Sequence, residues 1–440
     1  PDPPPSPPPP MQPPEPPSPP PPPSPPPWWH LATTYGPHGA ALLDHLAGVS
    51  LTNSHNALSA YGTRLVTTYA TYDGCWKSTT ATFDWASDAW QAAHAMSDDA
   101  CHSRGPVLAL AMSGDGRYLC VSRQKYLYFY NWNDDGEWVH AGTRDTYFSE
   151  YINAASPSVV SMSMSADGTI LMAAEPARGI GVYGRSGSGT SASWYQSGSL
   201  IKVLPNNYQV QMSRSVAVSG DGTRMAEADV FGNVRVYNVG HGNNNRASWD
   251  PSMPWTGLWS GHVAGVGYST CTAWTGCAEY LDGVLWATIP GSPGTGGITS
   301  VALNHAGDVL AVARPYESGG SGQVTVYDSS GPGVNTAWTP RAGVVEGTHS
   351  LAQIGREGGI ALDRDGHVLA TSERYYNHGI LRVHKWMDGA WTEMANVQGQ
   401  TDEKANRGVA LSAEGKVVAV SPSKDTSSSG AVRVFVATHP

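Results

Sequence analysis

Residues that could perform chemistry are scattered along the 440-residue sequence and form no familiar motif. The fifteen histidines include no H-E-x-x-H pair, which would bind zinc on one helix face, and no G-x-S-x-G turn presents a serine nucleophile. We therefore expect no enzyme, no resident metal and no cofactor. A carboxylate pair assembled from distant loops, as a hydrolase or lyase would need, is left open because sequence does not show which loops meet.

One stretch, N-W-N-D-D-G-E, is a weak candidate for calcium binding. Asn131, Asn133 and Asp135 have the alternate spacing of calcium ligands in a loop. The stretch lacks the bidentate glutamate that should follow, and no comparable stretch occurs elsewhere in the chain. A plain turn between two strands is therefore the preferred interpretation.

A repeated unit supplies the elements that must position any site. Each unit reads as an apolar strand, a turn ending in Gly, a second apolar strand, a strand of the type V-x-V-Y and then a Trp. Four of the turn glycines follow Asp, and D-G favours a tight turn because Gly adopts positive φ without strain. The turn glycines are Gly62, Gly116, Gly168, Gly222, Gly307, Gly366 and Gly415.

Four strands per unit and seven units predict an all-β, seven-bladed β-propeller spanning residues 28–440. The last unit ends without a fourth strand, whereas WWHLATTYGPHG at the other end begins with Trp. We therefore expect residues 28–36 to complete the last blade and close the ring, which removes free sheet edges. Fourth strands are expected to open at Trp90, Trp138, Trp194, Trp255, Trp338 and Trp391.

One unit is longer than the others. Successive turn glycines are 49 to 59 residues apart, except for the 85 residues between Gly222 and Gly307. We expect residues 256–297 to form an insertion after blade four, pinned by a disulfide. An eighth, degenerate blade is the alternative.

The five cysteines fit an oxidising compartment. Cys271 and Cys277 suit a small disulfide loop, and Cys75 and Cys101 fall in one repeat, outside its expected strands, where they could pair. Cys120 lies in the strand YLCV, where other units carry small or apolar residues, so a buried free thiol is expected. Five unpaired thiols in a cytosolic protein are the alternative.

Residues 1–27 form a separate arm in which twenty residues are Pro. Each Pro fixes φ and disfavours the helical region in the residue before it, so the arm is expected to adopt polyproline II. At ~3.1 Å per residue it would extend roughly 80 Å. No Asn-x-Ser/Thr sequon occurs, so any glycan must be O-linked.

The Ser-Pro blocks of the arm resemble the hydroxyproline-rich glycoproteins of plant and green-algal extracellular matrices. The resemblance implies hydroxylated and glycosylated prolines, with sugar on some serines, and an extracellular location in a cell wall or surface fibre. Met11, Gln12 and Glu15 interrupt the proline-rich blocks, and the resemblance does not extend to them. The implied sites are Ser6, Pro7, Pro8, Pro9, Pro10, Ser18, Pro19, Pro20, Pro21, Pro22, Pro23, Ser24, Pro25, Pro26 and Pro27. A ligand for SH3-, WW- or profilin-type domains is the alternative, but the arm lacks the basic residues that usually flank such ligands.

The propeller units resemble FG-GAP-type repeats through V-A-L-S-x-D-G, LAVAR or VVAVS, V-R-V-Y and the trailing Trp. That resemblance implies an extracellular recognition or assembly module. WD-repeat propellers match less well because GH and WD dipeptides do not recur in register.

Partners follow from charge and aromatic content. The net charge of −10 gives no basic stripe for nucleic acid, and no apolar run is long enough to span a membrane. Candidate partner-binding residues, which could contact prolines or sugars, are Trp259, Tyr268, Trp274 and Tyr280. We expect a non-enzymatic structural glycoprotein that self-associates into a filament or matrix. A carbohydrate-binding or adhesion module, anchored in a matrix by the arm, is the alternative.

Overall fold

The computed structural model contains all 440 residues and describes most of the repeat region. The described residues are 30–31, 49–50, 55–72, 76–87, 89–102, 109–123, 126–145, 161–175, 179–196, 215–229, 232–238, 285–289, 300–331, 337–373, 379–398, 403–424 and 432–438. No α-helix occurs within these ranges, and no helix there is long and apolar enough to cross a membrane.

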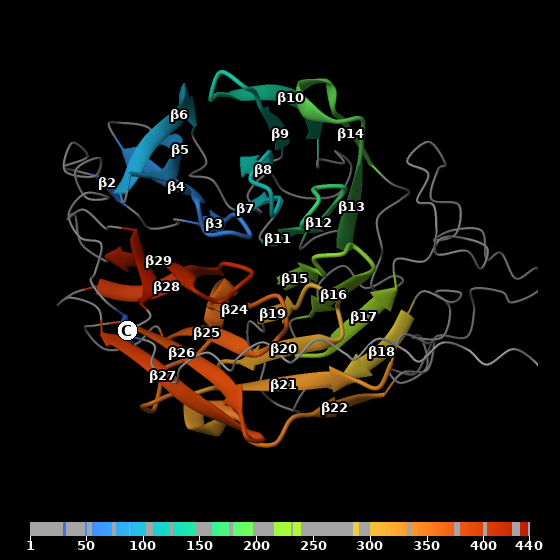
Figure 1. Ribbon diagram of the computed structural model, residues 1–440, viewed down its shortest axis with the longest axis vertical. Coiled ribbons are helices and arrows are strands. Elements are labelled where there is room, and N and C mark those ends of the chain that lie inside the picture. Colours follow the sequence, from blue (N-terminus) through green and yellow to red (C-terminus); the bar gives the residue numbers. More distant parts are fainter. Residues whose placement is uncertain are drawn as a thin grey trace, which may run out of the picture.

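Seven antiparallel sheets surround a central axis, so the fold is an all-β, seven-bladed β-propeller (Figure 1). Blade 1 contains β2 (Val49–Ser50), β3 (Asn56–Leu58), β4 (Arg64–Tyr72), β5 (Trp76–Ala86) and β6 (Ala89–His102). Blade 2 contains β7 (Ala109–Met112), β8 (Tyr118–Arg123), β9 (Tyr126–Trp132) and β10 (Trp138–Asp145). Blade 3 contains β11 (Ser161–Met164), β12 (Ile170–Glu175), β13 (Gly179–Ser186) and β14 (Ser193–Gln196).

The remaining four blades follow the same order. Blade 4 contains β15 (Ser215–Val218), β16 (Arg224–Ala228), β17 (Val234–Asn238) and β18 (Leu285–Ile289). Blade 5 contains β19 (Ser300–Leu303), β20 (Val309–Arg314), β21 (Gln323–Ser329), β22 (Trp338–Pro340) and β23 (Val345–Glu346). Blade 6 contains β24 (Ile360–Leu362), β25 (Val368–Glu373), β26 (Ile380–Met387) and β27 (Ala390–Gln398). Blade 7 contains β28 (Glu403–Leu411), β29 (Val417–Lys424), β30 (Arg433–Thr438) and β1 (His30–Leu31).

The turn between the first two strands of each blade joins the ring at its centre. The first strands of neighbouring blades contact one another in the order β3, β7, β11, β15, β19, β24, β28 and back to β3. Seven backbone hydrogen bonds also link each turn to the next around the ring. The bond that closes the ring is donated by Ala413 N–H of blade 7 to Ala60 C=O of blade 1 at 2.7 Å. The other six donors are Ala60, Gly114, Ala166, Asp221, His305 and Arg364.

The sequence of the turn explains why it recurs. In the second turn, the hydroxyl of Ser113 accepts hydrogen bonds from the backbone N–H groups of Arg117 and Tyr118, and donates one to Asp115. Ser59, Ser165, Ser219, Asn304, Asp363 and Ser412 hold the same position in the other turns. All seven predicted turn glycines have φ between 67° and 71°, which confirms the predicted turns.

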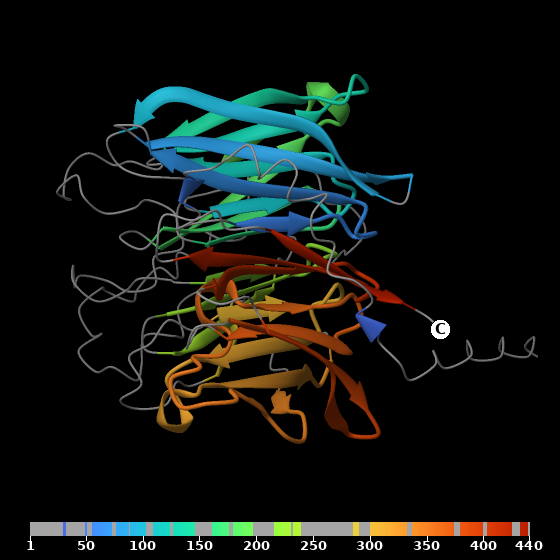
Figure 2. The same cartoon turned by 90° about the vertical axis from the view of Figure 1, so that its left-hand side faces the viewer.

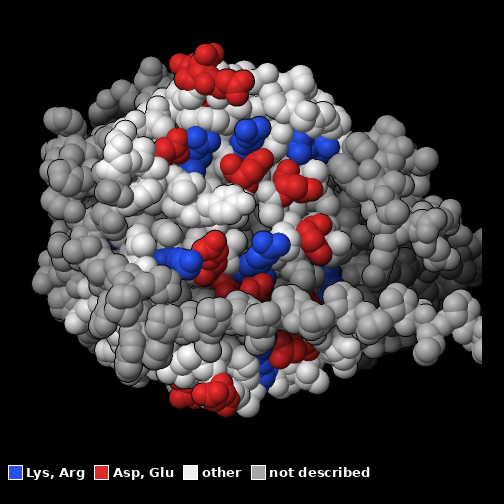
Figure 3. Space-filling view, viewed as in Figure 1, with Lys and Arg blue, Asp and Glu red and all other residues white. Residues whose placement is uncertain are grey.

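Arginine side chains join four pairs of neighbouring blades on the face that carries these turns. Arg64 of blade 1 donates to Gly116 C=O of blade 2 at 2.9 Å, and its guanidinium lies 3.8 Å from the ring centroid of Trp132. Arg224 and Arg341 likewise donate to the carbonyl group of a turn glycine in the next blade and lie over an aromatic ring there. Arg185 donates to Gly168 C=O of its own blade and joins blade 2 through the ring of Tyr118, 3.8 Å from its guanidinium. Figure 3 shows this face, where described basic side chains lie beside acidic ones.

The core lies between the blades. Each inter-blade cluster contains the second and third strands of one blade and the facing strands of the next, as with Phe129 of blade 2 against Leu171 and Trp194 of blade 3. Tryptophans at the start of the fourth strands occupy matching places in five clusters: Trp90, Trp138, Trp194, Trp338 and Trp391. Viewed from the side in Figure 2, the strands run between the two faces of the disc.

The fourth strand of blade 4 differs from the sequence prediction. It is β18, which pairs with β17 through Ile289 and Val234, and it does not open at Trp255. The segment Leu285–Ile289 thus belongs to the blade and not to an insertion after it, because its backbone hydrogen bonds complete the sheet. The rest of the predicted insertion, 256–284 and 290–297, and the predicted arm, residues 1–27, lie outside the described residues.

The closing strand is described only at two residues. His30 pairs with Thr438 and Leu31 with Ala437, on the outer edge of blade 7. Residues 28–29 and 32–36 lie outside the described part of the chain, so closure by the whole segment stays a prediction.

Candidate functional site

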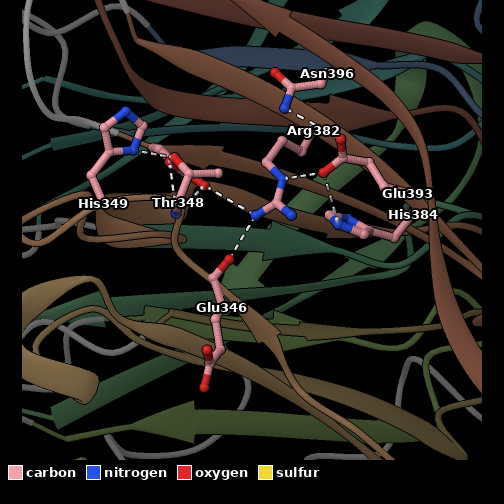
Figure 4. A network of polar contacts seen from close by, with 8 residues as sticks. Glu346, Thr348, His349, Arg382, His384, Glu393 and Asn396 are labelled. Atoms are coloured by element: carbon pink, nitrogen blue, oxygen red, sulfur yellow. Dashed lines mark hydrogen bonds and ion pairs between the residues drawn. The ribbon is translucent and has the colours of Figure 1, made fainter.

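A cluster of polar side chains lies between blades 5 and 6 (Figure 4). We call it the blade-6 polar cluster. Glu373 ends the second strand of that blade, Arg382 and His384 project from the third, and Glu393 and Asn396 come from the fourth. Glu346 ends β23 of blade 5, and the connection that follows supplies Thr348 and His349.

Arg382 is the centre of the cluster. Its Nε donates to Glu393 at 2.6 Å, and one terminal nitrogen donates to Glu373 at 3.1 Å and to the backbone carbonyl of Glu346 at 2.6 Å. The Glu373 side chain is 1% exposed, so its charge is removed from water and needs this partner. The arginine thus neutralises one buried and one surface carboxylate while tying the blade to the preceding connection.

The same charges set the protonation of neighbouring groups. Burial alone would raise the pKa of Glu393, but the hydrogen bond and the charge of Arg382 outweigh burial and lower it. Burial, assisted by the charge of Arg382, lowers the pKa of His384 to about 4 against the opposing effect of Glu393. At neutral pH, His384 is therefore uncharged, and its Nε2 lies 3.7 Å from a Glu393 oxygen.

Thr348, His349 and Glu373 have the residue types of a hydrolase triad, but their order differs. In such a triad the acid binds the histidine, and the histidine accepts the proton of the nucleophile. Here both the backbone N–H and the hydroxyl of Thr348 donate to Glu373, while His349 contacts the same hydroxyl. The carboxylate therefore holds the connection in place and does not orient an imidazole.

Blade 4 contains a similar pairing of an arginine with buried acids, made by different residues. Arg235 donates to Glu227 at 2.6 Å and to Asp229 at 2.9 Å, and Tyr237 also donates to Glu227 at 3.2 Å. Burial and the charge of Glu227 raise the pKa of Tyr237, so the phenol stays protonated as a donor. Asp229 and Arg235 occupy the strand positions of Glu373 and Arg382, so an acid paired with an arginine is a repeated structural element.

Six of the seven innermost strands carry no charged side chain, and the seventh, β28, begins with Glu403 and Lys404. The described strands β3, β7, β11, β15, β19 and β24 contain no Asp, Glu, Lys, Arg or His. Two serines at the start of these strands, Ser161 and Ser215, accept hydrogen bonds from the backbone N–H groups of Val216 and Val301 on the next blade. The inner wall formed by these strands is thus built for close approach of neighbouring backbones.

The calcium candidate is a turn between strands. Asn131 is fully buried and donates to Ala192 C=O of blade 3 at 2.9 Å, whereas Asn133 accepts a hydrogen bond from the backbone N–H of Glu137 at 2.8 Å. Asp135 is exposed. The structure therefore uses the two asparagines for packing and for the turn. No cluster of three or more His, Cys, Asp or Glu with metal-binding geometry occurs in the described residues.

Cys120 is a buried free thiol, as predicted. Burial raises its pKa, so the thiol stays protonated and unreactive in the folded chain. Its exposed fraction is 0%, with Phe129 and Leu171 in the same cluster.

The other predicted site residues lie outside the described side chains. They are the arm residues Ser6–Pro10 and Ser18–Pro27, the partner-binding candidates Trp259, Tyr268, Trp274 and Tyr280, and the cysteines Cys75, Cys101, Cys271 and Cys277. Cys101 is described as part of β6, though not at its side chain, so it lies in a strand and not outside one.

Sequence reasoning missed both the blade-6 polar cluster and the arginines that join blades. A usable signal existed for the cluster, since V-R-V-Y of blade 4 and L-R-V-H of blade 6 share an Arg, and both blades have an acid at the end of the preceding strand. For Arg64 no local signal exists, because its partner Gly116 is 52 residues away.

Comparisons with known proteins identify the fold alone. No family model matches the chain, and no curated protein matches it. Among solved structures, the chain is similar to the β-propeller domain of Myceliophteria thermophila Cps50 (Swd1), with a TM-score of 0.54 and 12% identity. The match covers 87% of this chain and 96% of that one.

Proposed function

We propose that this chain is a non-enzymatic structural glycoprotein of an extracellular fibre, wall or surface appendage. The observation that carries the proposal is the joining of a proline-rich arm with three Ser-Pro blocks to a propeller. The arm is a long, stiff element with no apolar face for a core of its own, and the ring is a rigid body with many surface positions. The combination suits an assembly subunit.

In this proposal the arm is a glycosylated polyproline II rod. Hydroxylated prolines after Ser6, Ser18 and Ser24 carry the sugars, which stiffen and solubilise it. At roughly 80 Å, the arm is long enough to reach a neighbouring propeller. Repetition of an arm-to-propeller contact that does not close on itself builds a filament.

The junction between arm and ring also supports the proposal. Only residues 28 and 29 separate the arm from His30–Leu31, which pairs with β30 on the outer edge of blade 7. We propose that residues 28–36 close the ring here. Load on the arm would then be borne by backbone hydrogen bonds within a sheet.

An oxidising compartment is proposed from the number and spacing of the cysteines. Trp76 pairs with His102 in antiparallel register, so the register of blade 1 does not set Cys75 opposite Cys101, and the pairing of these two cysteines rests on the sequence. We propose a disulfide between the two cysteines, and a second one between Cys271 and Cys277. Trp259, Tyr268, Trp274 and Tyr280 are proposed as partner-binding residues, and FG-GAP-like repeats as the family of the propeller.

The test is the assembly state with and without the arm. Sedimentation velocity of the full chain is compared with that of residues 28–440, which retain the closing segment. Loss of large species on removal of the arm supports the proposal. An unchanged size distribution contradicts it, and glycan binding by residues 28–440 alone would favour a carbohydrate-binding module instead.

A further inference from the structure

Blade 2 carries a row of aromatic rings that the repeat does not require. Tyr126, Tyr128 and Tyr130 alternate along β9, and His140 of β10 lies between the last two, with ring centroids 6.4 Å from Tyr128 and 5.7 Å from Tyr130. Tyr126 and Tyr128 are 6.1 Å apart. We call these four residues the tyrosine strip.

The residues equivalent to the tyrosine strip in other blades show which of its rings the core needs. The register position of Tyr130 carries an aromatic residue in most blades, so the core needs a ring there. The positions of Tyr126 and Tyr128 hold Gly179 and Gly181 in blade 3, and Gln323 and Thr325 in blade 5. Two tyrosines are therefore not needed there to build a blade.

The strip remains accessible in part. Tyr130 is buried, Tyr126 and Tyr128 are half-buried, and His140 and its neighbour Val139 are exposed. Arg123, at the end of the adjacent strand, places its guanidinium 5.6 Å from the Tyr128 ring centroid and is itself buried. The accessible part of the strip is therefore formed by Tyr126, Tyr128 and His140 on β9 and β10.

We infer that the tyrosine strip binds the polyproline segment Pro13–Pro17 from the arm of a second copy of this chain. This inference rests on the proposed function, in which the arm connects subunits. Polyproline II segments dock on aromatic-lined surfaces because they have no internal hydrogen bonds to lose and present preformed apolar faces.

Length and composition select this segment. The accessible part of the strip on β9 runs from Tyr126 to Tyr128, about 7 Å in a strand, and Pro13 to Pro17 covers it with about 12 Å of polyproline II. The segment P-P-E-P-P contains no Ser and separates the Ser-Pro blocks proposed to carry glycans, so its prolines are free to contact rings. Glu15 is its only charge.

The test uses the full chain and a variant with Tyr126→Gln and Tyr128→Thr, the residues that blade 5 has at these positions. We expect self-association, measured by sedimentation velocity, to weaken by about tenfold or more. The melting temperature should fall only modestly, because blade 5 folds with these residues although Tyr128 also packs against the core between blades 1 and 2. Tyr61→Gln is the matched control, because Tyr61 is 76% exposed and lies outside the strip. Equal association of the double variant and the wild type overturns the inference.

Failure of the inference is distinguishable from failure of the proposed function. Alanine at Pro13, Pro14, Pro16 and Pro17 should weaken association as the strip variant does. If only the alanine variant has an effect, the arm connects subunits and the strip is wrong. If the wild type does not associate, the proposed function fails.

A synthetic peptide of residues 10–18 is then titrated into the full chain, with tryptophan fluorescence as the readout. Saturable binding that needs Tyr126 and Tyr128 upholds the strip, and absence of binding overturns it. Binding that appears only after the chain's own prolines are replaced assigns the strip to its own arm and overturns the second copy.

Discussion

The indole N–H of Trp138 donates a 2.7 Å hydrogen bond to the hydroxyl of Thr82 on the neighbouring blade. The equivalent tryptophans Trp90, Trp194, Trp338 and Trp391 have buried indole nitrogens without a hydrogen-bond partner. The residue facing the ring explains the difference, since Thr82 is replaced by Val434, Phe129, Val236 and Val326 in those clusters.

Thr82→Val should therefore lower the free energy of unfolding by about 1 to 2 kcal/mol, because a buried donor loses its acceptor. Thr80→Val is the control, since the Thr80 hydroxyl is buried without a partner two residues earlier in the strand. It should be neutral or stabilising. Denaturant unfolding of both variants measures the difference, and equal effects would show that the hydrogen bond contributes nothing.

The turn glycines should tolerate no side chain. Gly168 has φ of 67°, and an added Cβ would lie 2.5 Å from the Tyr118 ring of the preceding blade. Gly189 has φ of 60° but an open surrounding, so Gly189→Ala measures backbone strain alone, about 1 kcal/mol. Gly168→Ala should cost at least twice as much, because strain and a clash add. Similar unfolding midpoints for the two variants would contradict the inter-blade contact.

Stability should depend on pH through His384. Its folded pKa of about 4 lies below the ordinary value of 6.5, so the unfolded chain binds a proton that the folded chain resists. The free energy of unfolding is therefore highest above pH 6.5 and decreases as the pH falls towards 4. The decrease due to His384 is on the order of 3 kcal/mol.

The comparison needs a variant that keeps the packing. His384→Phe serves, because Phe83 and Phe435 occupy this position in blades 1 and 7. Between pH 7 and 4 the wild type should lose more stability than the variant, as measured by denaturant unfolding at each pH. Parallel pH profiles would mean that His384 titrates normally in the folded chain.

The sequence predicted the repeated features of the fold and missed those made by unrelated residues. All seven turn glycines were predictable, since positive φ at a fixed place in each unit leaves only Gly comfortable. Cys120 was predictable from the small and apolar residues of its strand position. The repeat therefore makes a residue's role predictable wherever the blades share a residue type at that position.

Where a blade departs from the repeat, the sequence failed. Trp255 satisfied the spacing of a fourth strand, yet β18 lies about 30 residues further on, because only backbone pairing decides which apolar segment joins a sheet. The blade-6 polar cluster depends on a connection that brings Thr348 to Glu373, a contact between residues 25 apart. A single sequence does not show where such a connection folds back.

The cysteines test the proposed compartment. Peptide mapping without reduction should find Cys75 linked to Cys101, and Cys271 to Cys277. Cys120 should resist alkylation until denaturant is added, since it is fully buried and burial raises its pKa. A disulfide involving Cys120, or five alkylated thiols in native protein, would contradict the assignment.

The most direct test of the central claim is the covalent state of the arm. Intact-mass and glycopeptide mass spectrometry of residues 1–27 from native material should show added oxygen on prolines that follow Ser6, Ser18 and Ser24, with pentose- or hexose-sized additions on them. Pro13, Pro14, Pro16 and Pro17 should carry no sugar, because they must contact the tyrosine strip. An unmodified arm would contradict the account of an extracellular structural glycoprotein and would leave a bare polyproline ligand.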